Sequence, residues 1–143
     1  MVGRPILSLT LAAALVAGCG GTAAEAKLKA NVKYAKGGGI AGVSQQLTVR
    51  PDGTGVATSQ EQRRSFKVSA ATRRALERAV KSADLAHTKN PKKRGEGADG
   101  FGYSVSYGPH RVTWTDFTAD PPERVERLYS LLDELYERYA PSS

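Results

Sequence analysis

Apolar side chains alternate with polar ones in short segments of this chain, and that alternation predicts its strands. In LKANVKY (28–34) every second position is apolar, which is typical of a strand with one buried face. VSQQLTVR (43–50) repeats the pattern less regularly, because Gln45 falls on the apolar side. A third strand is expected over 55–68, after the turn PDGTG (51–55), whose proline and glycines favour chain reversal. We expect the polar middle of that strand, SQEQRR, to lie at an edge or in solvent.

Two other segments have the period of an amphipathic helix. Ser69 is expected to cap a helix in SAATRRALERAVKSADLA (69–86), whose apolar residues recur at steps of three and four. A second helix of about 19 residues is expected to begin within DPPE (120–123). There Asp120 and Glu123 have the spacing of a capping box, and Pro121 suits the first helical position. The tyrosines on its apolar stripe are most simply explained as core.

The remaining segments complete the fold class. FGYSVSY (101–107) and RVTWTDF (111–117) alternate around GPH, which is the pattern of a β-hairpin. The preceding HTKNPKKRGEGADG (87–100) has no period and is expected to be a long loop. The order is therefore βββ-α-ββ-α. We expect a single α+β domain over residues 27–140, an antiparallel sheet of about five strands with two helices packed on one face.

The N-terminal segment predicts export. Arg4 precedes an apolar run that ends near Ala17, which is shorter than the ~20 residues needed to span a membrane and has the length of a secretory signal core. The run ends LVAGC (15–19), which is similar to the lipobox of bacterial lipoproteins. In those proteins the signal is removed before the cysteine and the thiol is acylated. An alternative is an ordinary signal peptide followed by an incidental cysteine.

The lipobox resemblance implies three segments before or at the start of the domain. These are a cleaved signal peptide over 1–18, a lipidated Cys19, and a flexible tether that completes residues 19–26. Two acyl chains on Cys19 would hold the protein in the lipid bilayer, on the extracytoplasmic face of the cell membrane.

Charge is distributed unevenly along the chain. Residues 19–115 contain 17 Lys and Arg against 7 Asp and Glu, whereas residues 116–143 contain 3 against 7. The basic stretch KNPKKRGEG (89–97) supplies candidate contacts for an anionic surface, namely Lys89, Lys92, Lys93 and Arg94. Export argues against nucleic acid as the partner and favours anionic lipid or wall polymer. A solvated loop without a partner is the alternative.

Motifs of catalysis and metal binding are absent from the sequence. It has no His-Glu-x-x-His, no phosphate-binding glycine loop before a helix and no Gly-x-Ser-x-Gly. A single cysteine excludes an intramolecular disulfide framework and makes no metal site. Ser104, Asp99 and His110 have the residue types of a catalytic triad. However, the alternation places Ser104 on the opposite face of its strand from Tyr103, and nothing places His110 beside it. We expect a protein that is not an enzyme, with no catalytic residue, no metal and no cofactor.

The glycine-rich stretch between the first two strands carries a family resemblance. GGGIAG (37–42), together with ADGFGYSVSYG (98–108), resembles the emfourin-like family, named for an inhibitor of thermolysin-like metalloproteases. The resemblance runs from about Asn31 to Tyr139. It implies an α+β domain that inhibits an extracytoplasmic metalloprotease. The candidate contact is the loop formed by Gly38, Gly39, Ile40, Ala41 and Gly42.

Two interpretations of that loop stay open. The glycines would let it fold back over the sheet with Ile40 against the core, or the loop is an exposed tip that enters a hydrophobic protease pocket. Two functions also stay open. The first is a membrane-tethered protease inhibitor, and the second is a non-enzymatic envelope module that binds anionic lipid or wall polymer through its basic segment.

Overall fold

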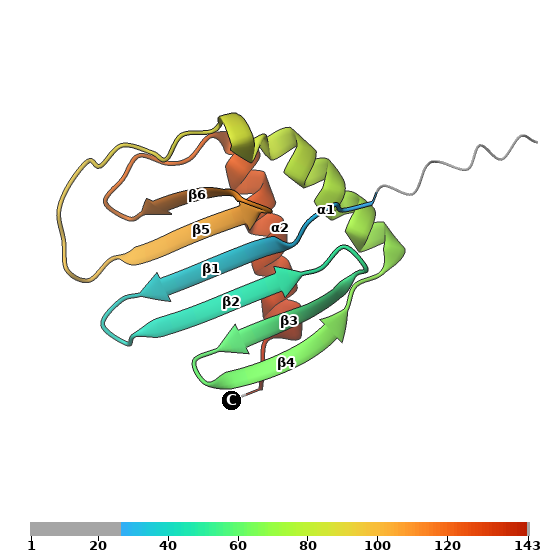
Figure 1. Cartoon of the computed structure of the whole chain (residues 1–143). Coiled ribbons are helices and arrows are strands. Elements are labelled where there is room, and N and C mark those ends of the chain that lie inside the picture. The colour runs from blue at the N-terminus through green and yellow to red at the C-terminus, as the bar shows by residue number, and fades with distance from the viewer. Residues whose placement is uncertain (1–26, 143) are drawn as a thin grey trace, which may run out of the picture.

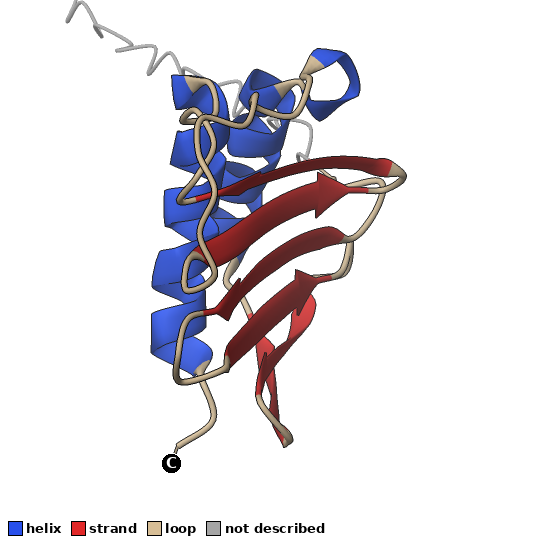
Figure 2. Cartoon of the chain, turned by 90° about the vertical axis from the view of Figure 1, so that its left-hand side faces the viewer, coloured by secondary structure: helices blue, strands red, loops and turns tan. Residues whose placement is uncertain are grey.

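The computed structural model describes residues 27–142, which form one antiparallel sheet with two helices packed on one of its faces (Figures 1 and 2). The elements are β1 (Val32–Gly38), β2 (Val43–Val49), β3 (Thr54–Ser59), β4 (Gln62–Lys67), α1 (Ala70–Ala83), the 3-10 turn η1 (Leu85–His87), β5 (Phe101–Tyr107), β6 (His110–Thr115) and α2 (Glu123–Tyr139). This confirms the predicted α+β class and its antiparallel sheet. The predicted signal peptide, Cys19 and the tether lie outside the described residues.

The sheet places β1 near its centre. Strands β1 to β4 form a meander, and β5 returns to pair with β1, so the order is β4-β3-β2-β1-β5-β6. Val32 lies opposite Val49 on one side and Tyr107 on the other, and Tyr34 lies opposite Leu47 and Val105. Consequently β4 and β6 are the two edge strands.

The sheet has six strands where the sequence predicted about five. The segment 55–68, expected as one strand, is divided into β3 and β4 by a tight turn. Gln60 has a left-handed backbone there, with φ of 50°, and Ser59 pairs with Gln62 across the turn. The sequence has neither Asn-Gly nor Asp-Gly at this point, the usual signal for such a reversal. The polar middle of the segment is therefore the turn itself, and its exposed continuation is the edge strand β4.

The core lies between the sheet and the helices. Alternate residues of the strands point toward the helices, and several are almost fully buried, among them Val32, Tyr34, Leu47, Val105 and Val112. They pack under the apolar stripe of α2, whose buried residues are Val125, Leu128, Leu132, Leu135 and Tyr136. From α1 the core receives Leu76, Val80 and Ala83. One sheet face thus contributes to the core through its period of two, and each helix through one stripe.

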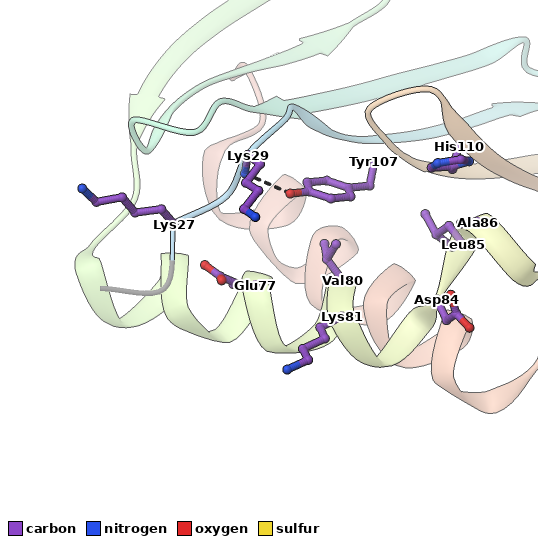
Figure 3. A pocket seen from close by; sticks show the side chains of 10 residues that line it. All are labelled: Lys27, Lys29, Glu77, Val80, Lys81, Asp84, Leu85, Ala86, Tyr107 and His110. Atoms are coloured by element: carbon purple, nitrogen blue, oxygen red, sulfur yellow. Dashed lines mark hydrogen bonds between the residues drawn. The ribbon is translucent and has the colours of Figure 1, made fainter. Parts of the chain in front are cut away.

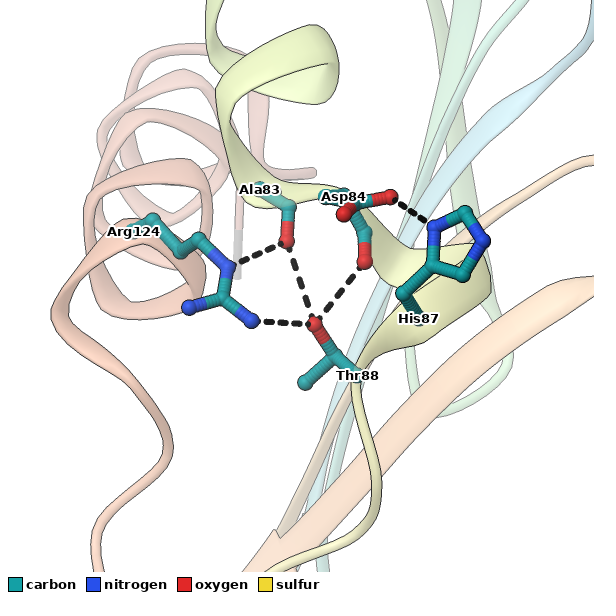
Figure 4. A network of polar contacts seen from close by, with 5 residues as sticks. All are labelled: Ala83, Asp84, His87, Thr88 and Arg124. Carbon is teal, nitrogen blue, oxygen red and sulfur yellow. Dashed lines mark hydrogen bonds and ion pairs between the residues drawn. The ribbon is translucent and has the colours of Figure 1, made fainter.

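Helix α1 begins as the sequence predicts and ends in a polar network. The Ser69 hydroxyl accepts a hydrogen bond from the Thr72 backbone N–H at 3.1 Å, which confirms the predicted N-cap. At the other end, Arg124 of α2 donates to the carbonyl oxygen of Ala83 at 3.1 Å and to the hydroxyl of Thr88 at 3.0 Å (Figure 4). The Thr88 hydroxyl donates to the carbonyl of Asp84 at 2.9 Å. These bonds satisfy carbonyls that a helix end leaves free, and they join α1 to the first turn of α2.

The predicted start of α2 is wrong. The helix begins at Glu123, its N-cap residue is Pro122, and no side chain caps it, so Asp120 and Glu123 form no capping box. A residue that precedes proline is disfavoured in the helical conformation. Because Pro122 follows Pro121, the chain stays extended until after the second proline. The helix has 17 residues, slightly fewer than expected.

Candidate functional site

The connection between β1 and β2 presents an exposed apolar side chain. We call residues 38–42 the β1–β2 tip. Ile40 is 91% exposed, and among residues 27–142 it is the one large hydrophobic side chain exposed in this way. The interpretation that places Ile40 against the core is therefore wrong. The tip lies at one end of the sheet, beside the loop that precedes β5 (Figure 1).

The glycines give the tip a defined backbone. Gly38, Gly39 and Gly42 all have positive φ, at 113°, 72° and 59°, a region in which L side chains are strained. The N–H of Gly42 donates to the carbonyl of Gly39 at 3.1 Å and closes the turn around Ile40. The sequence needs several glycines here because the chain takes a left-handed conformation at three positions.

A second reason for glycine is the close approach of the segment that leads into β5. The N–H of Gly39 donates to the carbonyl of Gly100 at 3.3 Å. A Cβ atom at Gly39 would lie 2.9 Å from the ring of Phe101, and one at Gly38 would lie 2.6 Å from the oxygen of Gly100. Because these contacts leave no room for a side chain, the tip is held against the start of β5.

An aromatic cleft opens beside the tip on the side of the sheet that carries the helices. Its volume is about 700 Å³, and its lining includes Lys36, Tyr103, Trp114, Asp116, Tyr129 and Asp133. Tyr103 and Trp114 stack with ring centroids 5.7 Å apart, and Tyr129 meets Trp114 edge-on at 5.3 Å. Lys36 connects the cleft to the tip, because its Nζ lies 5.5 Å from the centre of the Phe101 ring.

Two carboxylates, those of Asp116 and Asp133, hold tyrosines at the aromatic cleft in place through hydrogen bonds. Asp116 accepts hydrogen bonds at 2.8 Å from the backbone N–H of Phe101 and from the hydroxyl of Tyr103. The bond from Phe101, followed by that from Tyr103, lowers the pKa of Asp116. Burial and then the bond to Asp116 raise the pKa of Tyr103 to about 12. On the inner side, the Tyr34 hydroxyl donates to Asp133 at 2.6 Å, and burial and then this bond raise the pKa of Tyr34.

The basic segment is exposed, but its backbone is part of the fold. The side chains of all four candidate residues, Lys89, Lys92, Lys93 and Arg94, are exposed. The Lys93 ammonium lies 2.9 Å from the carboxylate of Glu96. The carbonyl of Lys92 accepts from the N–H of Ala119 at 2.9 Å, and the N–H of Arg94 donates to the carbonyl of Phe117 at 2.7 Å. The backbone of the loop therefore pairs with the segment that follows β6, and the charged side chains of the loop are exposed.

A different pocket lies at the opposite end of β1. It has a volume of about 400 Å³ and lies between the segment 27–29, α1 and the β5–β6 hairpin (Figure 3). Val80, Leu85 and Tyr107 contribute apolar surface, and lysines 27, 29 and 81 lie around it. The backbone N–H of Lys29 donates to the Tyr107 hydroxyl at 2.9 Å. Since Tyr107 pairs with Val32, at the start of β1, this pocket is separate from the tip.

The structure does not bring Ser104 and His110 of the considered triad together. Ser104 points away from the helices, whereas His110 pairs with Tyr107 on the helix side, so the two side chains lie on opposite faces of the sheet. Within residues 27–142 there is no group of three or more His, Cys, Asp or Glu side chains that could hold a metal ion. Neither described helix is long and apolar enough to cross a membrane.

No protein-family model matches this chain, and no curated protein matches it either. The sequence analysis missed the aromatic cleft, since it explained the tyrosines of the last helix simply as core. The signal available was the alternation that puts Tyr103 and Trp114 on one face of their hairpin.

Proposed function

We propose that this protein is a proteinaceous inhibitor of thermolysin-like metalloproteases, as its resemblance to the emfourin-like family implies. In this proposal it is a lipoprotein held on the extracytoplasmic face of the cell membrane by acylated Cys19. The observation that carries the inhibitory function is the 91% exposure of Ile40 on a tip whose backbone is defined by glycines and by Gly100.

An exposed isoleucine is a source of binding energy. Moving such a side chain from water into a hydrophobic pocket gains about 1.5–3 kcal/mol. The neighbours of Ile40 at the apex are Gly39 and Ala41, so the apex offers one apolar side chain with little bulk beside it. This shape suits the hydrophobic specificity pocket of a thermolysin-like enzyme.

The rigidity of the tip supports the same function. A loop that is ordered before binding loses less conformational entropy when it binds. Here the hydrogen bond from Gly42 to Gly39 closes the turn, and the bond from Gly39 to Gly100 holds it against the start of β5. The tip alone is smaller than the ~800 Å² per partner of a standard interface. We therefore expect Lys36, Phe101 and the rim of the aromatic cleft to contact the protease as well.

Titration of the full chain against thermolysin-like proteases tests this proposal. We expect stoichiometric loss of proteolysis with the wild-type chain, retained inhibition with Ile40→Val, and greatly weakened inhibition with Ile40→Asp. A variant with Lys89→Gln and Lys92→Gln should inhibit like the wild type, because these side chains lie in the basic loop. A correctly folded wild-type chain that inhibits none of these enzymes would remove the inhibitor class. Equal inhibition by Ile40→Asp would move the contact to another surface.

A further inference from the structure

The face of the sheet turned away from α1 and α2 is a polar surface of one charge sign. We call it the open face, because no described helix covers it (Figure 2). The strand register places the side chains of Lys33, Arg63, Lys67 and Arg111 on it. Its other positions are mostly serine, threonine, glutamine, glycine and alanine. No position of the six strands that faces this side is Asp or Glu.

Apolar side chains contribute little to the open face. Val56 is the one large aliphatic residue whose register places it there, and it is only 8% exposed. It is also absent from the core cluster under the helices, as expected for a residue on the other side of the sheet. The strands contribute no aromatic residue to this face, because Tyr34, Phe66, Phe101, Tyr103, Tyr107 and Trp114 all point toward the helices.

A notch lies in the open face across β2, β1, β5 and β6. Lys33 pairs with Ser106, and Ser106 pairs with Arg111, so two basic side chains flank one small hydroxyl residue. The notch has a volume of about 250 Å³ and is also lined by Thr48, Gln46 and Ser104. Lys33 and Arg111 are two strands apart, which corresponds to about 10 Å at the usual strand spacing. Both side chains are exposed, and neither belongs to an ion pair among residues 27–142.

We propose that the open face binds a linear phosphate-bearing polymer, with Lys33 and Arg111 holding a phosphate group across Ser106. The two cations supply the charge, and the partly exposed hydroxyls of Ser104 and Thr48 supply hydrogen-bond donors for phosphate oxygens, whereas Ser106 is only 5% exposed. This site uses none of the residues of the β1–β2 tip, and it is distinct from the basic loop at residues 89–94.

The distribution of charge indicates a polymer. Arg63 and Lys67 lie on the edge strand β4, Lys33 lies on β1, and Arg111 lies on the opposite edge strand β6. A ligand that reaches all of them crosses the whole sheet and carries anionic groups at intervals along its length. A single anion satisfies only one pair of these side chains.

Two other anionic partners fit this face less well. Nucleic acid without base pairing is usually held by stacking on aromatic side chains, and this face has none. A bilayer surface is usually held by basic residues together with apolar side chains that enter the lipid. The exposed Ile40 lies at the end of the sheet instead of on this face.

Binding of inorganic polyphosphate to the full chain tests the proposal. The test variant carries Lys33→Glu and Arg111→Glu, and the matched control carries Lys89→Glu and Lys92→Glu, which changes the net charge by the same amount. We expect the test variant to bind polyphosphate at least roughly tenfold more weakly, because it loses the attraction of two basic side chains for phosphate. The slope of the logarithm of the binding constant against the logarithm of the salt concentration should become about 2 less steep, because two phosphate contacts are lost. The control should bind like the wild type.

A further variant separates shape from charge. Ser104→Leu fills the notch without changing a charge, and we expect it to weaken binding while the thermal unfolding midpoint stays close to that of the wild type. Equal weakening by the control would show a general effect of net charge and overturn the site. The proposal would also fail if phosphatidylglycerol vesicles or single-stranded DNA bound as tightly as polyphosphate with the same dependence on Lys33 and Arg111. Absence of polyphosphate binding by the wild-type chain would overturn it outright.

Discussion

The two ends of β1 differ in how far their surroundings bury the side chains. At its start, Val32 and Tyr34 are buried under the helices, and the Tyr34 hydroxyl is bonded to Asp133. Past its end, the chain leaves the cover of the helices and presents Ile40 to solvent. One strand therefore contributes to the stability of the fold at one end and leads into the proposed contact surface at the other. Substitutions at the two ends should separate these roles.

The largest expected effect on stability comes from the core between the sheet and α2. Leu132 of α2 is fully buried, and Leu132→Ala should lower the free energy of unfolding by about 2–5 kcal/mol through lost burial and a cavity. Chemical denaturation measures this. The control is Glu134→Ala on the exposed side of the same helix, which should change the value by less than about 0.5 kcal/mol. Similar losses for both variants would contradict the assignment of the core.

A smaller loss of stability is expected from alanine substitutions at two glycines of the tip, and the two losses should differ. Gly39→Ala and Gly42→Ala both place a side chain at positive φ, which costs about 1–2 kcal/mol. Only at Gly39 does the new Cβ meet the Phe101 ring, because nothing lies within 4 Å of a Cβ at Gly42. We therefore expect Gly39→Ala to unfold at a lower denaturant concentration than Gly42→Ala. The opposite order would show that the tip is not held against β5.

Asp116 lies near the tip end of β1, where it accepts hydrogen bonds from Phe101 and Tyr103, and its effect on stability depends on pH. Its folded-state pKa is lowered by the hydrogen bonds from Phe101 and Tyr103, whereas an unfolded aspartate titrates near about 3.9. The carboxylate therefore stabilises the fold above that pH, and its contribution is lost as the pH falls through the lower folded value. Asp116→Asn should lower the unfolding midpoint at pH 7 and have less effect at the acid end. A difference that stays constant with pH would contradict this.

The smallest stability effect is expected at Ile40 itself. Because the side chain is 91% exposed, Ile40→Asp should change the free energy of unfolding by less than about 0.5 kcal/mol. The same variant is expected to lose inhibition. A large fall in stability would mean that Ile40 packs against the fold in solution.

Sequence periodicity predicted the elements whose burial repeats regularly, such as the hairpin at 101–115 and the stripe of α2. It failed where a single backbone conformation decides the outcome. Gln60 takes a left-handed conformation at a position where the sequence has neither glycine nor asparagine. The pair Pro121–Pro122 moves the start of α2 to Glu123.

The candidate site could be located from the sequence but not described. Four glycines within residues 37–42 indicated a special loop, but glycine permits both a folded-back and a projecting conformation, so Ile40 stayed ambiguous. The aromatic cleft and the notch in the open face both depend on the pairing of β1 with β5. That contact joins residues far apart in the sequence, and no local pattern specifies its register.

In the proposed complex, the β1–β2 tip enters the active site of the protease. The most direct measurement replaces Ile40 with a photo-crosslinking amino acid and maps the crosslinked peptides in a complex with a thermolysin-like protease, with the same replacement at Lys89 as the control. We expect position 40 to crosslink to the wall of the hydrophobic specificity pocket, and position 89 to form no such crosslink. Crosslinks from position 40 to a surface away from the active site, or none in a chain that inhibits the enzyme, would contradict it.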